Sequence, residues 1–392
     1  MPEKTYDVVV VGGGIIGTLA AHALVERGAR VALVERHHVG SGTTARSFAW
    51  INASSKVADE PYHRLNALGA AGYRRLAETY GDERLGLHRT GMLQCVNRRD
   101  GATHAAILEQ ARHLSSYNYP HRMIDADALA VLEPGLTFDA DDLALHAFTE
   151  DWLDAPLFAR TITDVLAASG AEVLEHCTAR ELAMAEDGAV TGVLTDAGML
   201  HTEKVLIATG ADTPDVLAGL TGYAAFAARF PMNRVPGLLV TTPEDGADGK
   251  LQHVIYFERA SGAFHIRPAG RGALRLGADD TDGMITEDAT NEEIHIAASR
   301  LLDRAKKRLP GLIDGVGPEQ CELAIGVRPY PQDGKTLAGP LPGAEGLFLI
   351  ATHSGITLAP ALGDLMAGQI LDGTLAQELR PFSLERFPGF AL

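Results

Sequence analysis

Residues 8–17 read Val8-Val9-Val10-Val11-Gly12-Gly13-Gly14-Ile15-Ile16-Gly17. Four consecutive β-branched residues predict a strand that is buried on both faces, as in a parallel sheet. The glycines form a G-x-G-x-x-G pattern, and each has a physical task in the turn that follows the strand. Gly12 permits the tight turn, Gly14 lets the backbone approach a pyrophosphate, and Gly17 lets the next helix pack on the sheet. This stretch therefore predicts a dinucleotide-binding turn.

The following residues extend the turn into a βαβ unit. Apolar residues recur with helical spacing over 15–27, Gly28 ends the helix, and a second strand is predicted over 30–35. The first turn of the helix would offer free N–H groups and a positive dipole end to the phosphates. Glu35 ends the second strand, where a carboxylate can accept hydrogen bonds from ribose hydroxyls. Because this acid disfavours a 2′-phosphate, the unit predicts NAD or FAD rather than NADP.

The composition excludes several classes of function. The chain has 392 residues, of which 42 are glycine, and its 34 Lys and Arg against 51 Asp and Glu give a formal charge of −17. Nucleic acids and anionic membranes require a basic surface, so neither is an expected partner. No apolar run reaches the roughly 18 residues of a membrane span, and the first residues lack the features of a signal peptide. Three cysteines without a C-x-x-C pair are typical of a reducing compartment, so we expect a cytoplasmic protein.

Two kinds of pattern share the rest of the chain. Helical spacing predicts helices at 61–80, 101–133, 156–168, 291–309 and 359–371. Short apolar runs predict strands at 172–175, 190–195, 204–208 and 347–351. Alternating runs between glycine turns predict antiparallel strands at 238–241, 253–258, 263–267 and 274–277. This mixture of helices, parallel strands and antiparallel strands predicts an α/β protein and not a repeat of one unit.

The order of these patterns indicates two interleaved domains. The nucleotide-binding domain is expected to comprise residues 1–80, 150–215 and 330–392. The substrate domain, of α+β type, is expected to comprise residues 81–149 and 216–329. No low-complexity linker marks the boundaries, so the chain is predicted to cross between the domains within ordered structure.

Three further blocks give the sequence a specific family resemblance. They are Gly40-Ser41-Gly42-Thr43-Thr44-Ala45-Arg46-Ser47, Val205-Leu206-Ile207-Ala208-Thr209-Gly210-Ala211 and Leu347-Phe348-Leu349-Ile350-Ala351-Thr352-His353-Ser354-Gly355-Ile356-Thr357-Leu358-Ala359-Pro360-Ala361-Leu362-Gly363. Together with the N-terminal glycines they resemble the D-amino acid oxidase (DAO) superfamily of flavoproteins, in particular its glycine oxidase and sarcosine oxidase branch. The resemblance spans the chain. It implies FAD as the cofactor, held by a Rossmann-like domain that is interleaved with an antiparallel-sheet substrate domain.

The resemblance and the βαβ unit together assign residues to the cofactor. The expected FAD-binding residues are Gly12, Gly14, Ile15, Ile16, Gly17, Glu35, Arg36, Gly42, Thr43, Thr44, Arg46, Ser47, Thr209, Gly210, Ser354, Gly355, Ile356, Thr357 and Leu358. A helix that begins near Leu358 would direct its positive end at the pyrimidine side of the flavin, where it favours negative charge on the reduced ring. No second G-x-G-x-x-G is present, so the electrons are expected to come from a bound substrate rather than from NAD(P)H.

The flavin is expected to be bound without a covalent link. Some relatives attach FAD through a His just after the Gly-Thr-Thr-like loop, where this chain has Arg46. Others use a Cys a few residues before an Asp-rich turn, which corresponds to about Gly326 here. Cys321 lies five residues before that position and is predicted to be a small core residue.

The substrate side of the site is expected to centre on Arg328. The block Gly326-Val327-Arg328-Pro329 is similar to the glycine oxidase block in which the Arg binds the substrate carboxylate. The planar guanidinium fits that task because it is always charged and matches a carboxylate with two parallel hydrogen bonds. The alternative is a surface Arg before a proline turn.

The antiparallel strands offer further candidates. Strand alternation places Phe264 and Ile266 on one face and His265 and Arg267 on the other, so only one pair can face the substrate. Tyr256 and Phe264 are expected to do so, and Arg267 is expected to be a structural partner for acidic groups.

Two more residues are candidates whose environment the sequence leaves open. Arg275 falls where sarcosine oxidases carry a Lys linked to oxygen activation, but it could equally be an exposed strand residue. His353 could be structural, or it could lie beside the flavin or the substrate. The pairs and runs at 37–38 and 279–283 lack ligand spacing, so no metal site is expected.

The resemblance implies oxidation of the C–N bond of an amino acid or N-substituted amino acid. Arg328 would hold the carboxylate, the Cα–H hydride would pass to flavin N5, water would hydrolyse the imine, and O2 would be reduced to H2O2. One alternative is a dehydrogenase of a 2-hydroxy acid or amine with a non-oxygen acceptor. Another is a flavin-binding subunit of a larger complex. The identity of the amine and the oligomeric state are left open.

Overall fold

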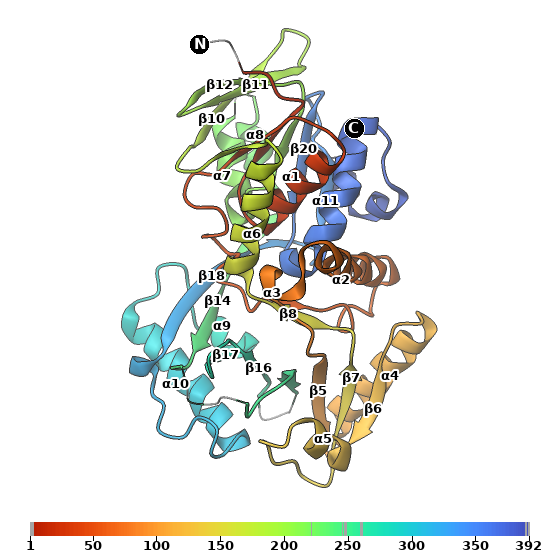
Figure 1. The fold of residues 1–392 in the computed structure, drawn as a ribbon, viewed down its shortest axis with the longest axis vertical. Helices are drawn as coiled ribbons and strands as arrows, with labels where there is room; N and C mark the ends of the chain where they lie inside the picture. Colours follow the sequence, from red (N-terminus) through yellow and green to blue (C-terminus); the bar gives the residue numbers. More distant parts are fainter. Residues whose placement is uncertain are drawn as a thin grey trace.

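The computed structural model describes residues 4–220, 222–244, 246, 249–258, 262–388 and 390. Two parts lie end to end along the long axis of the molecule, and the chain passes repeatedly between them (Figure 1). The upper part in Figure 1 contains both ends of the chain, and the lower part is made of segments from its middle. This arrangement agrees with the predicted interleaving.

The upper part is built on a six-stranded sheet of order β19-β20-β13-β1-β2-β9. Its strands are β1 (Val8–Val11), β2 (Val31–Val34), β9 (Glu172–Leu174), β13 (Val205–Ile207), β19 (Leu337–Pro340) and β20 (Leu347–Ala351). All neighbours are parallel except β19 and β20. The predicted parallel sheet is therefore confirmed, with one antiparallel strand at its edge.

Different layers cover the two faces of this sheet. Helices α1 (Ile15–Glu26), α2 (Glu60–Tyr80), α3 (Asp82–Leu85), α6 (Ala155–Ala168) and α11 (Gly355–Asp372) cover one face. The other face packs on α7 (Thr213–Gly219), α8 (Ala224–Ala227) and a three-stranded sheet of β10 (Ala179–Met184), β11 (Val190–Thr195) and β12 (Gly198–His201). Val8 and Val10 belong to the first core and Val9 and Val11 to the second, as the alternation of side chains along a strand requires.

Small residues allow α11 to lie close to its neighbours. A β-carbon on Gly363 would lie 2.8 Å from the carbonyl oxygen of Leu19 on α1. A β-carbon on Gly69 of α2 would lie 2.1 Å from the carbonyl oxygen of Thr357. Because this backbone approach has no room for a side chain, α11 is held in one position with its first turn toward the lower part.

The lower part is built on an eight-stranded sheet of order β18-β14-β17-β16-β15-β5-β7-β6. Its strands are β5 (Met92–Asn97), β6 (Arg122–Asp125), β7 (Asp142–Ala147), β14 (Met232–Thr241), β15 (Val254–Phe257), β16 (Phe264–Pro268), β17 (Leu274–Gly277) and β18 (Glu322–Pro331). The sheet is antiparallel apart from the pair β15 and β5. One face packs on α5 (Ala126–Leu132), α9 (Asp279–Asp282) and α10 (Asn291–Arg308), and α4 (Gly101–Ser116) packs on the other.

Smaller elements join the two parts. A three-stranded sheet contains β3 (Trp50–Ile51), β4 (Leu87–His88) and β8 (Asp151–Leu153). Short 3-10 helices lie at Gly210–Asp212, Pro318–Gln320, Gln377–Phe382 and Leu384–Arg386. β14 and β18 are the longest strands and extend from the lower sheet to the junction (Figure 1).

Two predicted helices differ from those in the structure. The predicted helix at 101–133 is α4 and α5 with strand β6 between them. The last helix begins at Gly355, several residues before the predicted start. Both errors arise because alanine-rich sequence matches a helical spacing without marking where a helix begins. The exact domain boundaries stay a prediction.

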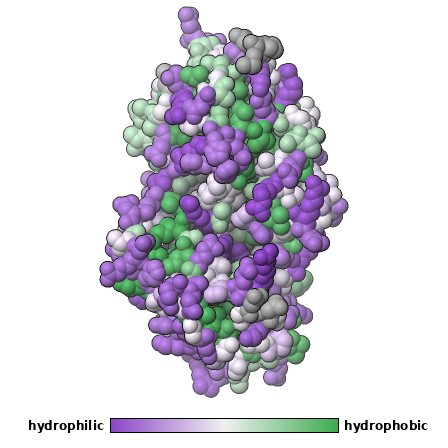
Figure 2. All heavy atoms as spheres, turned by 60° about the vertical axis from the view of Figure 1, so that its left-hand side comes forward, coloured by the Kyte–Doolittle hydropathy of each residue, from purple (hydrophilic) through white to green (hydrophobic). Residues whose placement is uncertain are grey.

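The surface fits the acidic composition. Hydrophilic side chains cover most of the face shown in Figure 2. Exposed large apolar residues lie on separate elements, for example Leu68 on α2, Met199 on β12 and Ile296 on α10. Among the described residues, no helix is long and apolar enough to span a membrane.

Candidate active site

A cavity of about 1040 Å³ lies between the two parts. Its walls come from the turn after β1, the end of β2, the loop 40–56, the start of α11, and the strands β14, β15 and β18. The volume is at the upper end of the roughly 300–1,000 Å³ of typical ligand sites. One cavity can therefore hold an extended cofactor and a small substrate together.

The upper end of the cavity is the glycine turn of the βαβ unit. Gly12 has a φ of +107°, and a β-carbon there would lie 2.5 Å from the carbonyl oxygen of Ala208. A β-carbon on Gly17 would lie 1.9 Å from the carbonyl oxygen of Gly12. Gly17 thus packs α1 against the strand, as expected. Gly12 and Gly14 both border the cavity, and only Thr44 Oγ1, at 3.5 Å, lies near a β-carbon placed on Gly14.

Glu35 borders the cavity at the end of β2. One carboxylate oxygen accepts a hydrogen bond from the Gly13 N–H at 2.7 Å, and the other accepts one from the His37 N–H at 2.8 Å. These bonds fix the carboxylate beside the turn and leave further lone pairs for ribose hydroxyls. The next residue, Arg36, also borders the cavity and pairs with Asp212 at 2.5 Å.

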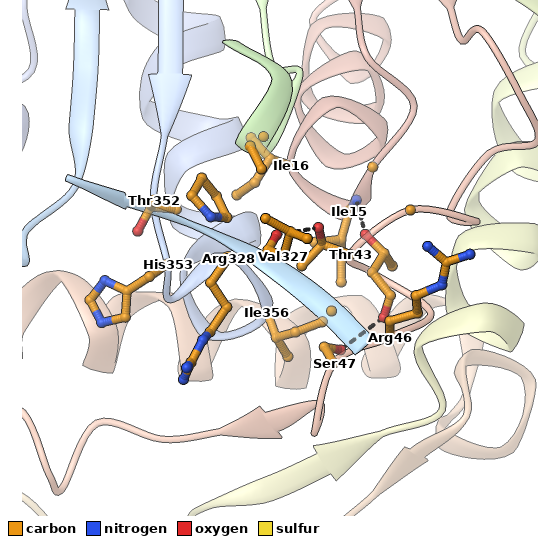
Figure 3. A pocket seen from close by; sticks show the side chains of 18 of the residues that line it. Ile15, Ile16, Thr43, Arg46, Ser47, Val327, Arg328, Thr352, His353 and Ile356 are labelled. Carbon is orange, nitrogen blue, oxygen red and sulfur yellow. Dashed lines mark hydrogen bonds between the residues drawn. The ribbon is translucent and has the colours of Figure 1, made fainter. Parts of the chain in front are cut away.

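The loop 40–47 lies against β18 along the middle of the cavity. Thr44 Oγ1 accepts a hydrogen bond from the Ile15 N–H at 3.0 Å, and Thr43 Oγ1 donates one to the Val327 carbonyl at 2.7 Å. Ser47 Oγ donates to the Thr44 carbonyl at 2.8 Å (Figure 3). These bonds tie the loop to α1 and to the strand that carries Arg328, so the cofactor wall and the substrate wall are one connected structure.

Helix α11 points its N-terminus into the same cavity. Ser354 is the residue before its first turn, and Gly355, Ile356 and Thr357 border the cavity. Leu358 does not border the cavity, because its side chain is fully buried in the core against α1. The free N–H groups of the first turn of α11 face the cavity. The positive end of the helix dipole can therefore favour negative charge on a ligand there, as expected.

The other expected cofactor residues also border the cavity. They are Ile15, Ile16, Gly42, Arg46, Thr209 and Gly210. A glycine turn, a fixed carboxylate and two helix N-termini thus converge on one cavity. The described residues fit a dinucleotide that carries a flat ring, with the ring near α11 and the loop 40–47.

Arg328 lies on β18 at the lower side of the cavity. Its Nη2 donates to Asp282 Oδ2 at 2.8 Å, and its Nε is buried without a hydrogen-bond partner among the described residues. Its side chain borders the same cavity as that of His353, and the two lie near one another in Figure 3. The guanidinium therefore has N–H groups that remain free to bind a ligand. Its place on the cavity wall differs from the alternative interpretation, a surface Arg before a proline turn.

Asp282 at the end of α9 holds that guanidinium in place. Its other oxygen accepts a hydrogen bond from the Leu238 N–H at 2.8 Å. A β-carbon on Gly237 would lie 2.9 Å from Asp282 Oδ2, so glycine makes room for the carboxylate. Burial raises the pKa of Asp282 to about 6, although Arg328 and the Leu238 N–H lower it. The run 279–283 was considered only as a metal site, so this role of Asp282 was not predicted.

The register of the lower sheet corrects one expected substrate residue. Tyr256 pairs with His265 across β15 and β16, and both border the cavity. Phe264 pairs with Phe257 instead, and the two rings stack 5.0 Å apart in the core under α10. Directly paired residues point to the same face, so Phe264 faces away from the cavity and its predicted substrate role is wrong.

The two arginines of these strands have structural partners. The Arg267 guanidinium lies 4.3 Å from the Trp152 ring and donates to the Phe48 carbonyl, rather than pairing with an acidic group. Arg275 Nη1 donates to the Ser47 carbonyl at 3.1 Å. Arg275 is half-buried and supports the end of the loop 40–47. This place differs from both alternatives, a cation linked to oxygen activation and an exposed strand residue.

His353 borders the cavity between β20 and α11. Its ring lies 4.5 Å from the Tyr330 ring, and its Nε2 lies 3.3 Å from Ser354 Oγ. Burial, together with the positive charges of Lys56 and Arg328, lowers the pKa of His353 to about 3. The ring is therefore neutral at physiological pH and can only exchange hydrogen bonds with a ligand.

Comparison with known proteins identifies the family. A model of the DAO family, described as FAD dependent oxidoreductase, matches residues 7–369. The chain belongs to the DAO family. This DAO family member is thus an FAD-dependent oxidoreductase, and FAD is the cofactor that the cavity fits.

Known DAO-like proteins resemble the chain over almost its whole length. Glycine oxidase from Geobacillus kaustophilus (strain HTA426) is 28% identical over 403 residues, which cover 98% of each chain. A crystal structure of glycine oxidase from Geobacillus kaustophilus gives a TM-score of 0.80 at 24% identity, over 98% of this chain and 100% of that chain. L-proline dehydrogenase from P. horikoshii gives a TM-score of 0.80 at 20% identity, over 98% and 97% of the two chains. The predicted fold class is therefore confirmed.

The sequence reading missed several polar residues of the cavity. They are Asn52, Ser55, Lys56, Gln94, Arg234, Asp279, Asp282 and Glu287. Asn52, Ser55 and Lys56 could have been predicted, because they belong to a polar stretch that follows directly after the loop 40–47. The others come from distant segments and meet only through the sheet register.

Two further features concern possible metal ligands and Cys321. Among the residues that the structure describes, no group of three or more His, Cys, Asp or Glu side chains could hold a metal ion. Cys321 Sγ is 3.4 Å from the Gly317 carbonyl and packs at the edge of the lower core. Burial raises its pKa to about 11, which disfavours a reactive thiolate.

Proposed function

We propose that this DAO family member oxidises the C–N bond of a small amine that carries a carboxylate, such as glycine, sarcosine or a D-amino acid. The observation that supports this most is Arg328, whose guanidinium faces the cavity beside the start of α11 and the loop 40–47. A fixed cation at that place fits a carboxylate whose neighbouring carbon must lie over the flavin.

The surrounding residues suit a neutral amine. Burial raises the pKa of Tyr256 to about 12, so its hydroxyl stays protonated and can donate to the substrate. Burial lowers the pKa of His265 to about 4 and that of His353 to about 3, so these two cavity histidines are neutral at physiological pH. No proton-transfer chain is needed, because positioning supplies much of the acceleration in such a reaction.

Bound FAD would supply the redox chemistry, a two-electron oxidation of the substrate at the expense of O2. The residues of the chain bind and orient. Arg328 would hold the carboxylate, Tyr256 would cover the substrate from β15, and α11 would stabilise negative charge on the reduced ring through its N-terminus. The released imine would be hydrolysed by water.

Anaerobic reduction of the flavin tests this proposal directly. We expect glycine, sarcosine or a D-amino acid to bleach the visible flavin spectrum, and admission of air to restore it with release of H2O2. Reduction by glycolate alone would indicate a 2-hydroxy acid dehydrogenase. Reduction by amines without peroxide would indicate another electron acceptor.

The Arg328→Ala variant tests the carboxylate assignment. Loss of a charged hydrogen-bonding partner should lower kcat/KM for the preferred amine by about 100-fold or more. Arg328→Lys keeps the charge without the planar fork and should lose less. Arg300→Ala on α10 removes an exposed arginine far from the cavity and serves as the control. Full turnover by Arg328→Ala with intact flavin would refute the assignment.

A further inference from the structure

The cavity contains a second cation, Lys56, that the proposed chemistry does not use. Three other cavity cations have carboxylate partners: Arg328 pairs with Asp282, Arg36 with Asp212, and Arg234 with Glu287. Arg46 also borders the cavity, but its side chain is exposed, whereas Lys56 is partly buried. The Lys56 ammonium makes no hydrogen bond or ion pair with any residue in the described part of the chain. A partly buried ammonium without a partner is unfavourable, and a ligand anion would relieve that cost.

The backbone that carries Lys56 is held firmly. Glu150, which is fully buried, accepts hydrogen bonds from the Ala53 N–H at 2.8 Å and the Ser54 N–H at 2.5 Å. Gln110 donates to the Ser54 carbonyl at 3.0 Å, and the Lys56 N–H donates to the Ala53 carbonyl at 3.1 Å. Because the backbone is fixed, binding an anion would immobilise only the side chain, which keeps the entropic cost low.

Lys56 also lies near the region where the substrate is expected. Lys56, Arg328 and His353 all border the same cavity. The positive charges of Lys56 and Arg328 both lower the pKa of His353, so both cations act on the same ring. Burial lowers the pKa of Lys56 itself, and the charges of Glu150 and Asp279 oppose that shift. Asp279 is exposed at the mouth and forms no ion pair with Lys56, so the ammonium remains available to the cavity.

We propose that Lys56 binds a second anionic group of the substrate, so that the preferred substrate is an amine with two carboxylates. This rests on the proposed function, in which Arg328 binds the carboxylate next to the carbon that is oxidised. The second carboxylate could belong to a substituent on nitrogen, as in iminodiacetate, or to the side chain of an acidic D-amino acid. Both sources are amines that carry two carboxylates, one for Arg328 and one for Lys56.

Anaerobic reduction with matched substrates separates the sources. Iminodiacetate is compared with sarcosine, and D-aspartate with D-alanine, because each pair differs by one carboxylate. We expect the dicarboxylate of one pair to reduce the flavin with at least tenfold higher kcat/KM than its monocarboxylate partner. The pair that shows the preference tells whether the second anion is carried on nitrogen or on the side chain.

Binding without turnover provides an independent measurement. Thiodiacetate and methylthioacetate replace the amine nitrogen by sulfur, and their binding is followed by the change in the flavin absorbance spectrum. Lys56→Met should weaken thiodiacetate binding by about tenfold or more, as expected for a lost charged hydrogen bond, and change methylthioacetate binding less than about twofold. Lys56→Arg should retain most of the affinity for thiodiacetate. Lys307→Met removes an exposed lysine of α10 and is the control.

The outcomes distinguish this inference from the function on which it rests. Reduction by sarcosine or glycine with no dicarboxylate preference, or equal weakening of both thioethers in Lys56→Met, would overturn the role of Lys56 and leave the amine oxidation standing. A preference for a substrate with a cationic side chain would also overturn it and would point to Asp279. Absence of reduction by any amine would overturn both proposals.

Discussion

At the scale of single residues, the site depends on how Arg328 is oriented before a substrate arrives. Asp282 holds one nitrogen of the guanidinium and is itself held by the Leu238 N–H. This contact restricts the side chain of Arg328 before the substrate arrives, which reduces the entropic cost of binding the substrate carboxylate. It also places a negative charge beside the point where the substrate carboxylate would bind, so the two anions compete for one cation.

This competition predicts pH-dependent binding of carboxylates. The pKa of Asp282 is raised to about 6, so the side chain is neutral below that pH and negative above it. Affinity for methylthioacetate should therefore fall as pH rises through about 6, by about three- to tenfold between pH 5 and 7.5. His353 and His265, with pKa values of about 3 and 4, do not titrate in this range.

Asp282→Asn separates this effect from other titrations. The amide keeps the acceptor for the Leu238 N–H but carries no charge, so the pH dependence should disappear. Binding is measured by flavin absorbance titration in wild type and variant over the same pH range. A variant that retains the full pH dependence would show that another group is responsible.

At the scale of elements, close backbone contacts fix the helices that border the cofactor. Pro360 within α11 cannot donate to the Ile356 carbonyl, and the Tyr73 hydroxyl of α2 donates to that carbonyl instead at 2.5 Å. The first turn of α11 is therefore completed by another helix. Together with the glycine contacts to α1, this holds the N-terminus of α11 toward the cavity.

Gly17→Ala tests the importance of close packing at α1. The added methyl group would lie 1.9 Å from the Gly12 carbonyl oxygen, so α1 or the glycine turn must shift. We expect a loss of about 1–3 kcal/mol in the free energy of unfolding, measured in urea, and at least about tenfold weaker FAD binding.

Gly368→Ala in α11 is the matched control, because nothing lies within 4 Å of the β-carbon it would add. Alanine is the better helix former, so this variant should gain up to about 1 kcal/mol and retain FAD. Equal effects of the two substitutions would contradict the packing explanation.

At the scale of the whole molecule, the cavity exists because two differently built sheets meet. The upper sheet supplies the glycine turn, Glu35 and the N-terminus of α11, and the lower sheet supplies Tyr256 and Arg328. The loop 40–47 contacts both. A cofactor bound along the cavity would therefore connect the two parts and stabilise them together.

This arrangement predicts a dissociable flavin that stabilises the fold. Acid precipitation should release FAD into the supernatant, and Cys321→Ser should leave the flavin content unchanged. Free FAD at 100 times its Kd should raise the free energy of unfolding of the apoprotein by about 2.7 kcal/mol, as measured in urea. Flavin that remains with the precipitated protein would refute non-covalent binding.

Several parts of the fold and the site follow from short stretches of sequence. Residues 8–17 fix the strand, the turn and the helix through local conformational limits, and Glu35 follows at the end of the next strand. Arg328 was predicted from the resemblance of the block 326–329 to the corresponding glycine oxidase block. The strand, the turn and the helix need only a few consecutive residues, so local chain chemistry determines them.

Tertiary structure decided what those segments face. Alternation showed that Phe264 and His265 lie on opposite sides, but the pairing of β15 with β16 selected His265 for the cavity. Arg328 pairs with Asp282, whereas Lys56 has no such partner in the part of the chain that the structure describes, and both facts depend on segments far apart in the chain. The physical reason is that strand periodicity and side-chain charge are local properties, whereas register and ion pairing are set by which distant segments pack together.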